Sequence, residues 1–377
     1  MKRFPFFVLL AFLLFACSKN NNDLSTSPIT KVADYLYLYD ADNYGTQPPS
    51  LSPTDVGFVS YGCSTVRNGN YYGRNFDFNI NELCEFVVRT HASPSRKHAS
   101  IGVSNTIIAT ITHDMIAAGL SEQQLNFIPW AAMDGINDAG LVCNSNVVNM
   151  ADLGPNKHEH TNPGQPKIMA LFLVRAILDN CATVQEAKDF INSHDILPLP
   201  SSWDLHLMIA DPSSTVIVEF TGDKGNEVKF TNANIMTNFY NYQYAASGKF
   251  PAHACGIERY NILRDGYSNG NSMEGMWQLL KSVRYTQAYL LDTDPFWCSE
   301  YYADIPNGDT SWNKEMILQQ EMPQTKIAAY QHYLATGQYD PKNNLWFTTH
   351  NSTYDIANRS LWVTIREKYD KRYEFKL

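Results

Sequence analysis

Short stretches rich in aromatic, β-branched and other apolar residues recur along the chain between turn signals, and such stretches predict β-strands. Phe58–Tyr61 and Tyr71–Phe78 look like strands, with the turn signal Asn68-Gly69-Asn70 between them. Ile101–Thr112 is a further β-rich run. Later stretches predict a β meander and a closing hairpin, with strands at Leu205–Ala210, Thr215–Thr221, Glu227–Phe230, Asn234–Thr237, Leu345–Thr349 and Leu361–Arg366.

The middle of the chain predicts helices. Lys167–Leu178 is apolar at nearly every turn, which indicates a buried helix. Thr183-Val184-Gln185-Glu186 is a capping-box pattern, which predicts a helix from there to about Ser193. Strands followed by helices and then by more strands favour an α+β fold with layered sheets.

The first residues have the pattern of an export signal. Lys2 and Arg3 precede the apolar run Pro5–Phe15, which is too short to span a bilayer comfortably. The run ends in Leu14-Phe15-Ala16-Cys17, which is typical of a bacterial lipoprotein signal, and an ordinary secretory signal with an incidental cysteine is the alternative. We therefore expect residues 1–17 to be a signal peptide that ends at a lipidated Cys17. The protein would be exported and lipid-anchored to a bacterial membrane, at the outer membrane, the cell surface or in the periplasm.

Residues 18–50 look like a linker, and no second linker, repeat or low-complexity stretch follows Val56. Residues 63–377 therefore read as one domain. The 377 residues are 44% hydrophobic and 18% charged, which suits a globular protein with a sizeable core. The net charge of −9 repels polyphosphate, so nucleic acid is not an expected partner.

Seven cysteines occur without a CxxC pattern. If Cys17 carries lipid and Cys63 is a reactive thiol, five widely spaced cysteines remain. This odd remainder argues against a complete disulfide framework and against a structural zinc site, and it leaves one or two disulfides open. A second candidate metal motif, His158-Glu159-His160, lies in a loop with glycine and proline at both ends, and we expect that loop to be solvated.

The stretch GCSTVRNGNYYGRNFDF, which begins at Gly62, carries the candidate chemistry. If the bond between Gly62 and Cys63 is cut, Cys63 offers a thiol and a free α-amine, and the amine can take the thiol proton. Arg74 could then stabilise the thiolate and Asp77 could orient the α-amine. On a regular strand Arg74 and Asp77 face opposite sides, so they need local twist or different contacts to converge on Cys63. A buried cysteine beside a structural Arg–Asp pair is the alternative.

This stretch resembles the nucleophile segment of the choloylglycine hydrolases, the penicillin V acylases and the isopenicillin-type acyltransferases. These are N-terminal-nucleophile (Ntn) hydrolases that act on linear amide C–N bonds. Four more segments resemble the family in the expected order, and together they cover nearly all of 63–377: Asp134–Val148, Leu205–Thr221, Ile235–Gln243 and Gly256–Arg264. The resemblance implies a four-layer αββα fold with two stacked, mainly antiparallel sheets between helical layers.

The resemblance also implies roles for individual residues. Cys63 would be the nucleophile, Arg74 and Asp77 its partners, Asn238 a member of the site and Arg259 a buried supporting arginine. Asn146 is our choice for the residue that binds the oxyanion, with Asn144 and Asn149 as competitors or a structural strand asparagine as the alternative. Residues 18–62 would be a tether and a propeptide, removed by cleavage between Gly62 and Cys63.

The implied activity is hydrolysis of a small-molecule N-acyl amide through an acyl-thioester, which needs no metal or organic cofactor. Acyl transfer to an amine is the competing enzymatic function. A non-catalytic surface-displayed binding lipoprotein is the competing function of another class. The sequence leaves the acyl group, homo-oligomerisation and the fate of the anchor after cleavage open.

Overall fold

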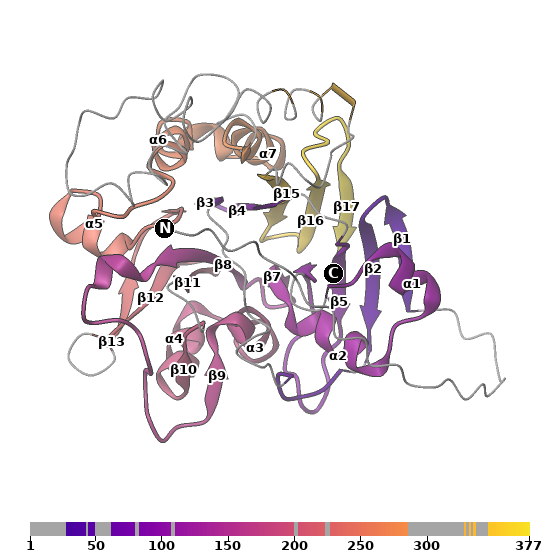
Figure 1. The fold of residues 1–377 in the computed structure, drawn as a ribbon, viewed down its shortest axis with the longest axis horizontal. Helices are drawn as coiled ribbons and strands as arrows, with labels where there is room; N and C mark the ends of the chain where they lie inside the picture. Colours follow the sequence, from indigo (N-terminus) through magenta and orange to yellow (C-terminus); the bar gives the residue numbers. More distant parts are fainter. Residues whose placement is uncertain are drawn as a thin grey trace, which may run out of the picture.

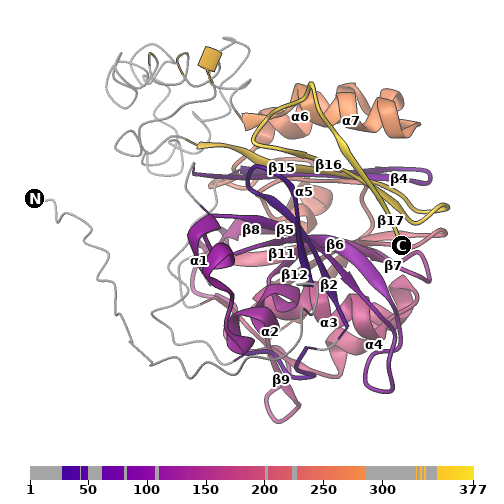
Figure 2. The same cartoon turned by 90° about the vertical axis from the view of Figure 1, so that its right-hand side faces the viewer.

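The structure is a computed structural model, and it describes residues 28–42, 44–49, 62–79, 83–106, 110–199, 203–222, 227–285, 328, 332, 335–336 and 346–377. Its elements form four layers (Figure 1, Figure 2). Helices α6 and α7 cover a smaller sheet, this sheet packs on a larger one, and α3 and α4 cover the far face of the larger sheet. The predicted αββα order of an α+β protein is therefore confirmed. Cys17 and the predicted strand Phe58–Tyr61 lie outside the described residues.

The larger sheet has nine strands in the described part of the chain, in the order β1-β2-β5-β6-β7-β8-β11-β12-β13. Neighbouring strands are antiparallel except β2 and β5, which run parallel. The strands are β1 (Ile29–Ala33), β2 (Leu36–Ala41), β5 (Glu85–Thr90), β6 (Ser100–Asn105), β7 (Ala132–Asn137), β8 (Val142–Asn149), β11 (Trp203–Ala210), β12 (Thr215–Thr221) and β13 (Glu227–Thr231).

The smaller sheet is antiparallel, with the order β14-β3-β4-β15-β16-β17. Its strands are β3 (Gly62–Asn68), β4 (Tyr71–Asn79), β14 (Ile235–Met236), β15 (Trp346–Asp355), β16 (Ser360–Ile365) and β17 (Tyr373–Lys376). The prediction that Asn234–Thr237 continues the meander is wrong, because β14 leaves the larger sheet and pairs with β3. This crossing brings Asn238, which follows β14, to the start of β3.

Two short parallel strands, β9 (Lys167–Met169) and β10 (Asp195–Leu197), pair outside both sheets. The predicted helix at Lys167–Leu178 is therefore wrong in its first part, because Lys167–Met169 pairs with β10 and the α-helix begins at Leu173. The α-helices are α1 (His113–Ala118), α2 (Glu122–Trp130), α3 (Leu173–Asn180), α4 (Val184–Asn192), α5 (Asn241–Ser247), α6 (Ile257–Asp265) and α7 (Met273–Ser282). Short 3₁₀-helices cover Met150–Leu153, Ala170–Phe172 and Tyr267–Gly270.

Helix α4 begins where the sequence predicts it. The Thr183 hydroxyl accepts a hydrogen bond from the Glu186 backbone N–H at 3.1 Å. The Glu186 carboxylate accepts from the Ala182 backbone N–H, one residue earlier than a regular capping box.

The linker predicted for residues 18–50 is wrong where it falls on β1 and β2. Leu36, Tyr37 and Tyr39 are buried, because β2 pairs along its length with β5 and the tyrosines join the core beneath the sheet. The polar residues on both sides of β2 make the region look like a linker, although β2 is a strand that pairs with the distant β5.

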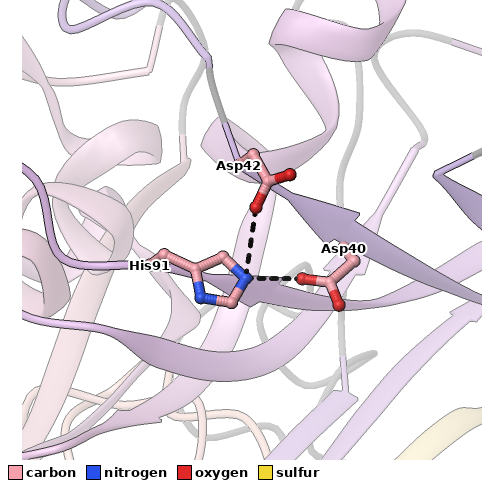
Figure 3. Close-up of side chains that lie close together, drawn as sticks. All are labelled: Asp40, Asp42 and His91. Carbon is pink, nitrogen blue, oxygen red and sulfur yellow. Dashed lines mark hydrogen bonds and ion pairs between the residues drawn. The ribbon is translucent and has the colours of Figure 1, made fainter.

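The residues that follow β2 are also held against the body of the protein. The Tyr44 hydroxyl donates to Asp179 at 2.7 Å, and the Arg96 guanidinium lies 4.2 Å from the centre of the Tyr44 ring. The Trp130 indole N–H donates to the Gly45 carbonyl at 3.0 Å. On the surface, Asp40 and Asp42 contact His91, which follows β5 (Figure 3).

Within the described ranges, no helix combines the length and apolar character that are needed to cross a bilayer. In the same ranges no disulfide joins two cysteines, and the five that are described are all buried.

Two glycines allow β6 and β7 to approach closely. Gly102 lies opposite Gly135 in the ladder, and a Cβ on Gly102 would lie 2.1 Å from the Asp134 carbonyl oxygen. Because the obstacle is backbone, the strands would have to shift. We expect Gly102→Ala to lower the free energy of unfolding, measured by urea denaturation, by about 1–3 kcal/mol or more. The matched change Gly45→Ala meets only an ordinary contact at 3.6 Å and should change it little. Both variants are made in a Cys63→Ala chain, in which the expected cleavage at Gly62 cannot occur. Equal stability of the two variants would contradict this packing.

Candidate active site

Cys63 is the second residue of β3, and its thiol points between the two sheets. Cys63 pairs with Phe76 on β4, so their side chains share a face, and Arg74 shares it too because it stands two residues from Phe76. The Arg74 Nη2 lies 3.9 Å from the Cys63 Sγ. Both side chains are fully buried. The predicted pairing of Arg74 with the thiol therefore has a direct structural counterpart.

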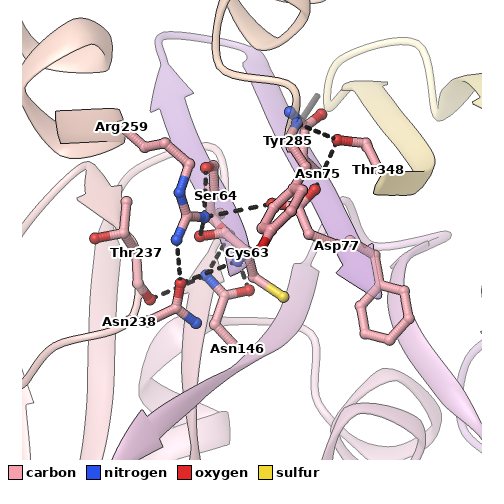
Figure 4. Close-up of polar contacts among 12 residues, drawn as sticks. Cys63, Ser64, Asn75, Asp77, Asn146, Thr237, Asn238, Arg259, Tyr285 and Thr348 are labelled. Carbon is pink, nitrogen blue, oxygen red and sulfur yellow. Dashed lines mark hydrogen bonds and ion pairs between the residues drawn. The ribbon is translucent and has the colours of Figure 1, made fainter. Parts of the chain in front are cut away.

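The main chain of Cys63 is held from the opposite side, by the loop after β14 and by α6 (Figure 4). The Cys63 N–H donates to the Asn238 Oδ1 at 2.9 Å. The Arg259 guanidinium donates to the Cys63 carbonyl oxygen and, at 2.7 Å, to the same Asn238 oxygen. Asn238 and Arg259 thus bind the two main-chain polar groups of Cys63, and their membership of a catalytic site stays a prediction.

A glycine at the start of α6 makes room for this arginine. Gly256 has a φ of 73°, and a Cβ there would lie 2.5 Å from the Arg259 Nη2. The Gly256–Arg264 motif therefore contains both the guanidinium and the space that it fills.

Asp77 lies on the helix-facing side of β4, opposite Gly62 in the ladder. Its carboxylate accepts from the Thr348 hydroxyl at 2.7 Å and lies 3.5 Å from the Arg259 Nη1. Burial raises the pKa of Asp77 to about 7, against the opposing effects of Arg259 and Thr348. Arg74 and Asp77 thus converge on Cys63 through different contacts, Arg74 at the thiol and Asp77 through the arginine that holds the main chain.

Asn146 lies beside β3 in a ladder of buried polar side chains. Its amide group donates to the Thr65 hydroxyl at 3.2 Å and lies 3.3 Å from the Thr237 carbonyl oxygen. Asn144 donates to the same hydroxyl at 3.0 Å and to the Asn146 Oδ1 at 2.9 Å. The third candidate, Asn149, instead caps the following 3₁₀-helix through the Ala151 N–H. Asn146 is thus beside the site, and its oxyanion role stays a prediction.

Three buried residues at this site were missed by the sequence analysis. Asp134 accepts from the Arg74 Nη1 at 3.0 Å, and His350 Nε2 lies 2.9 Å from the same Asp134 oxygen. The Nδ1 of His350 lies 2.5 Å from Glu85. Asp134 stands in a motif that was recognised, but His350 and Glu85 lie in strands whose pairing partners no local pattern reveals.

These contacts change the protonation behaviour of the buried groups. Burial alone would raise the pKa of Asp134, but the charge and hydrogen bond of His350, together with Arg74, lower it to about 2. Burial alone would lower the pKa of His350, but Glu85 and Asp134 raise it to about 9. Asp134 is therefore an anion and His350 a cation at neutral pH.

The other histidine clusters have structural explanations. The prediction of a solvated His158-Glu159-His160 loop is wrong for His158, which is buried with its Nδ1 2.5 Å from Asp204. Asp40, Asp42 and His91 are close enough to share a metal ion. However, the His91 Nε2 lies 2.7 Å from one carboxylate oxygen of Asp40 (Figure 3). The Arg89 Nη1 lies 3.4 Å from the other oxygen of Asp40. Side chains of the protein thus already contact these carboxylates, and the contacts link β2 to the end of β5.

Comparison with known proteins gives one family match. Residues 65–288 match the family model described as acyl-coenzyme A:6-aminopenicillanic acid acyl-transferase, and Cys63 stands just before the matched range. No curated protein matches the chain.

Similar solved structures include two variants of conjugated bile acid hydrolase from Clostridium perfringens. Each is 13% identical, with TM-scores of 0.41 and 0.43, covering 84% of this chain and 92% of the other. Penicillin V acylase from Agrobacterium tumefaciens is 15% identical with a TM-score of 0.41, covering 81% of this chain and 83% of the other.

The charged state of His350 predicts how stability depends on pH. Because its pKa rises from 6.5 to about 9 on folding, its stabilising contribution is complete below about pH 6.5 and is lost as pH rises through 9. In the uncut Cys63→Ala chain, we expect urea unfolding to show a loss on the order of 3 kcal/mol between pH 6.5 and 10. The additional change His350→Gln should lower stability at neutral pH and flatten this alkaline decline. An unchanged decline in that variant would assign it to another group.

Proposed function

This chain belongs to the acyl-coenzyme A:6-aminopenicillanic acid acyl-transferase family, and from that premise we propose that it is a cysteine Ntn hydrolase of linear N-acyl amides. One observation carries the proposal. The Cys63 nitrogen, which forms the bond to Gly62, donates a hydrogen bond to Asn238. The Arg74 guanidinium faces the Cys63 thiol. A nitrogen freed by cleavage would therefore already be held beside its own thiol.

The first step of the proposed mechanism is cleavage of the bond between Gly62 and Cys63. The Cys63 sulfur adds to the Gly62 carbonyl carbon, and the peptide C–N bond breaks. The Cys63 nitrogen takes the thiol proton and becomes an amine, while Gly62 is left as a thioester on Cys63. Water then adds its hydroxyl to that carbonyl and returns a proton to sulfur, which gives a Gly62 carboxylic acid and the free thiol.

Substrate turnover would repeat the chemistry on an external amide. The α-amine of Cys63 takes the thiol proton, and the thiolate attacks the substrate carbonyl carbon. The resulting ammonium protonates the leaving amine, and water resolves the acyl-thioester. Arg74 would stabilise the thiolate, and Asn238 and Arg259 would keep the amine and the carbonyl of Cys63 in place. Asn146 is the proposed hydrogen-bond donor to the oxyanion. To donate to it, the Asn146 amide would have to give up its hydrogen bond to Thr65 or Thr237.

Acyl transfer is the second candidate function, and the description of the matching family favours it. The two reactions share every step up to the thioester, and they differ in whether an amine or water accepts the acyl group. Adding amine acceptors to a reaction at fixed substrate and comparing amide with free acid separates them.

We also propose that the protein is exported and anchored through lipid on Cys17. The anchored piece would not be lost on cleavage at Gly62, because β1 and β2 lie upstream of the cut and are built into the larger sheet. Their burial and the Tyr44 contacts would hold the catalytic part at the membrane without a covalent bond.

The role of Cys63 is tested by N-terminal sequencing followed by assay with a panel of acyl amides. We expect the purified wild-type catalytic chain to begin at Cys63. Cys63→Ala should remain uncut and lose roughly 10⁴–10⁶-fold in kcat, as removal of a nucleophile does in other hydrolases. The matched variant Cys143→Ala removes another fully buried thiol and should be cut and active. Full turnover by an unbroken chain would refute the proposed function.

The fate of the upstream piece is tested on membranes from cells that express the wild-type protein. After detergent extraction we expect the catalytic chain and the fragment that carries β1 and β2 to elute together in size-exclusion chromatography. Cys17→Ala should release both pieces together into the soluble fraction. Recovery of the catalytic chain alone in the soluble fraction, with the fragment left on the membrane, would contradict this retention.

A further inference from the structure

A chain of four buried ionisable side chains lies between the two sheets, behind the Cys63 thiol. It runs from Arg74 on β4 to Asp134 on β7, then to His350 on β15 and Glu85 on β5. Arg74, Asp134 and His350 are fully buried, and Glu85 is 5% exposed. The chain thus alternates between cation and anion and crosses from the smaller sheet to the larger one twice.

Arg74 is the member of this chain that reaches the site, and its guanidinium is fixed on three sides. Its Nη1 contacts Asp134 at 3.0 Å, and its Nη2 donates to the Ser145 carbonyl at 2.8 Å. Its Cζ lies 4.6 Å from the centre of the Phe76 ring. The contacts with Asp134 and Ser145 together fix the guanidinium plane, and therefore the direction in which Nη2 faces the Cys63 Sγ.

Asp134 is itself fixed by two further groups. His350 Nε2 lies 2.9 Å from its Oδ2, and the Tyr354 hydroxyl donates to its Oδ1. The groups that face His350 are Asp134, Glu85, Arg74 and the stacked Phe76 ring, whose centre is 5.3 Å away. Asp134 and His350 both lie against the Arg74 Nη1, and the Nη2 of the same guanidinium lies 3.9 Å from the Cys63 Sγ, so Arg74 links them to the thiol.

We propose that Asp134 and His350 are positioning residues for the reaction of Cys63, which hold the Arg74 guanidinium against the sulfur through a buried ion-pair chain. This inference rests on the proposed function, because it assumes that Cys63 is the nucleophile. The contacts on which it is based do not depend on which amide is the substrate. It assigns a task to four charges that the fold buries at considerable cost. A preorganised cation at a reacting sulfur is worth more in such a dry site than in water.

A through-space charge effect of Asp134 and a positioning role for Asp134 predict opposite shifts in the pH at which Cys63 becomes reactive. Removing a nearby anion while Arg74 stays in place would favour the thiolate, and the reactivity of Cys63 would appear at lower pH. Releasing Arg74 from its position would remove the stabilising cation, and reactivity would appear at higher pH. The sign of the change therefore separates positioning from a through-space charge effect.

The experiment measures the rate at which iodoacetamide alkylates Cys63 as a function of pH, by mass spectrometry of the Cys63 peptide from the purified mature protein. In Asp134→Asn we expect the midpoint of this profile to rise by about one pH unit, a tenfold loss of thiolate at a given pH. The kcat should fall roughly 10- to 100-fold, and KM should change much less, because the misplaced group acts in the reaction rather than in binding. A midpoint that falls or stays unchanged would overturn the proposal.

Tyr354→Phe provides a milder variant in case Asp134→Asn does not fold. It removes the hydroxyl donor to Asp134 and leaves every charge in place. The midpoint should rise by a few tenths of a unit, and kcat should fall by about threefold to tenfold. His158→Gln is the matched control, since it breaks another buried His–Asp pair that does not contact Arg74. It should lower thermal stability without moving the midpoint, and a midpoint shift as large as that of Tyr354→Phe would also overturn the proposal.

The same variants keep this inference separate from the proposed function. If Cys63→Ala remains cut and active, the proposed function fails whatever the alkylation profiles show. If Cys63→Ala is inactive and the folded Asp134→Asn and Tyr354→Phe variants keep the wild-type midpoint and kcat, the positioning role alone fails.

Discussion

The pairing of β3 with β4 is the constraint on which the site depends. It places Cys63 opposite Phe76, so the thiol turns toward the larger sheet while the main chain stays open to α6. One residue can then present its sulfur to Arg74 and its nitrogen to Asn238 without any change in backbone conformation. A register shift of one residue would turn the thiol toward the helices and bring neither contact into reach.

The layers on either side of this pair do different kinds of work. The helix side supplies a neutralised cluster in which Arg259, Asn238 and Asp77 hold the main chain. The sheet side supplies the ion-pair chain that ends at Arg74. Buried ion pairs are weak evidence for stability, because desolvation offsets much of their attraction. The contacts of this ion-pair chain join strands of both sheets, and its proposed positioning of Arg74 is a better account of its presence at the centre of the fold than stability.

Local patterns in the sequence foretold much of the fold and part of the site. Strand β12 follows from its β-branched and apolar run, and helix α4 from the Thr183 cap, since both depend on residues a few positions apart. The proximity of Arg74 to the Cys63 thiol could be predicted because the two residues lie near each other in sequence. Asp134 and His350 were not visible, because they stand 60 and 276 residues from Arg74 and only the tertiary fold joins them. The same limit explains β14, whose partner strand lies far upstream. Strand β2 is different, because its Leu36–Tyr39 run is apolar and aromatic and was a local strand signal that the linker interpretation overlooked.

The parallel pairing of β2 with β5 fixes an order of events for a chain that is cut at Gly62. The sheet has to assemble while both pieces still belong to one polypeptide, because a severed β2 would have to find β5 by diffusion. Unfolding of the cut protein would then be hard to reverse, and its lifetime would be governed by how slowly it unfolds rather than by an equilibrium. Cleavage would thereby convert a precursor that can refold into a two-piece protein that is only kinetically stable.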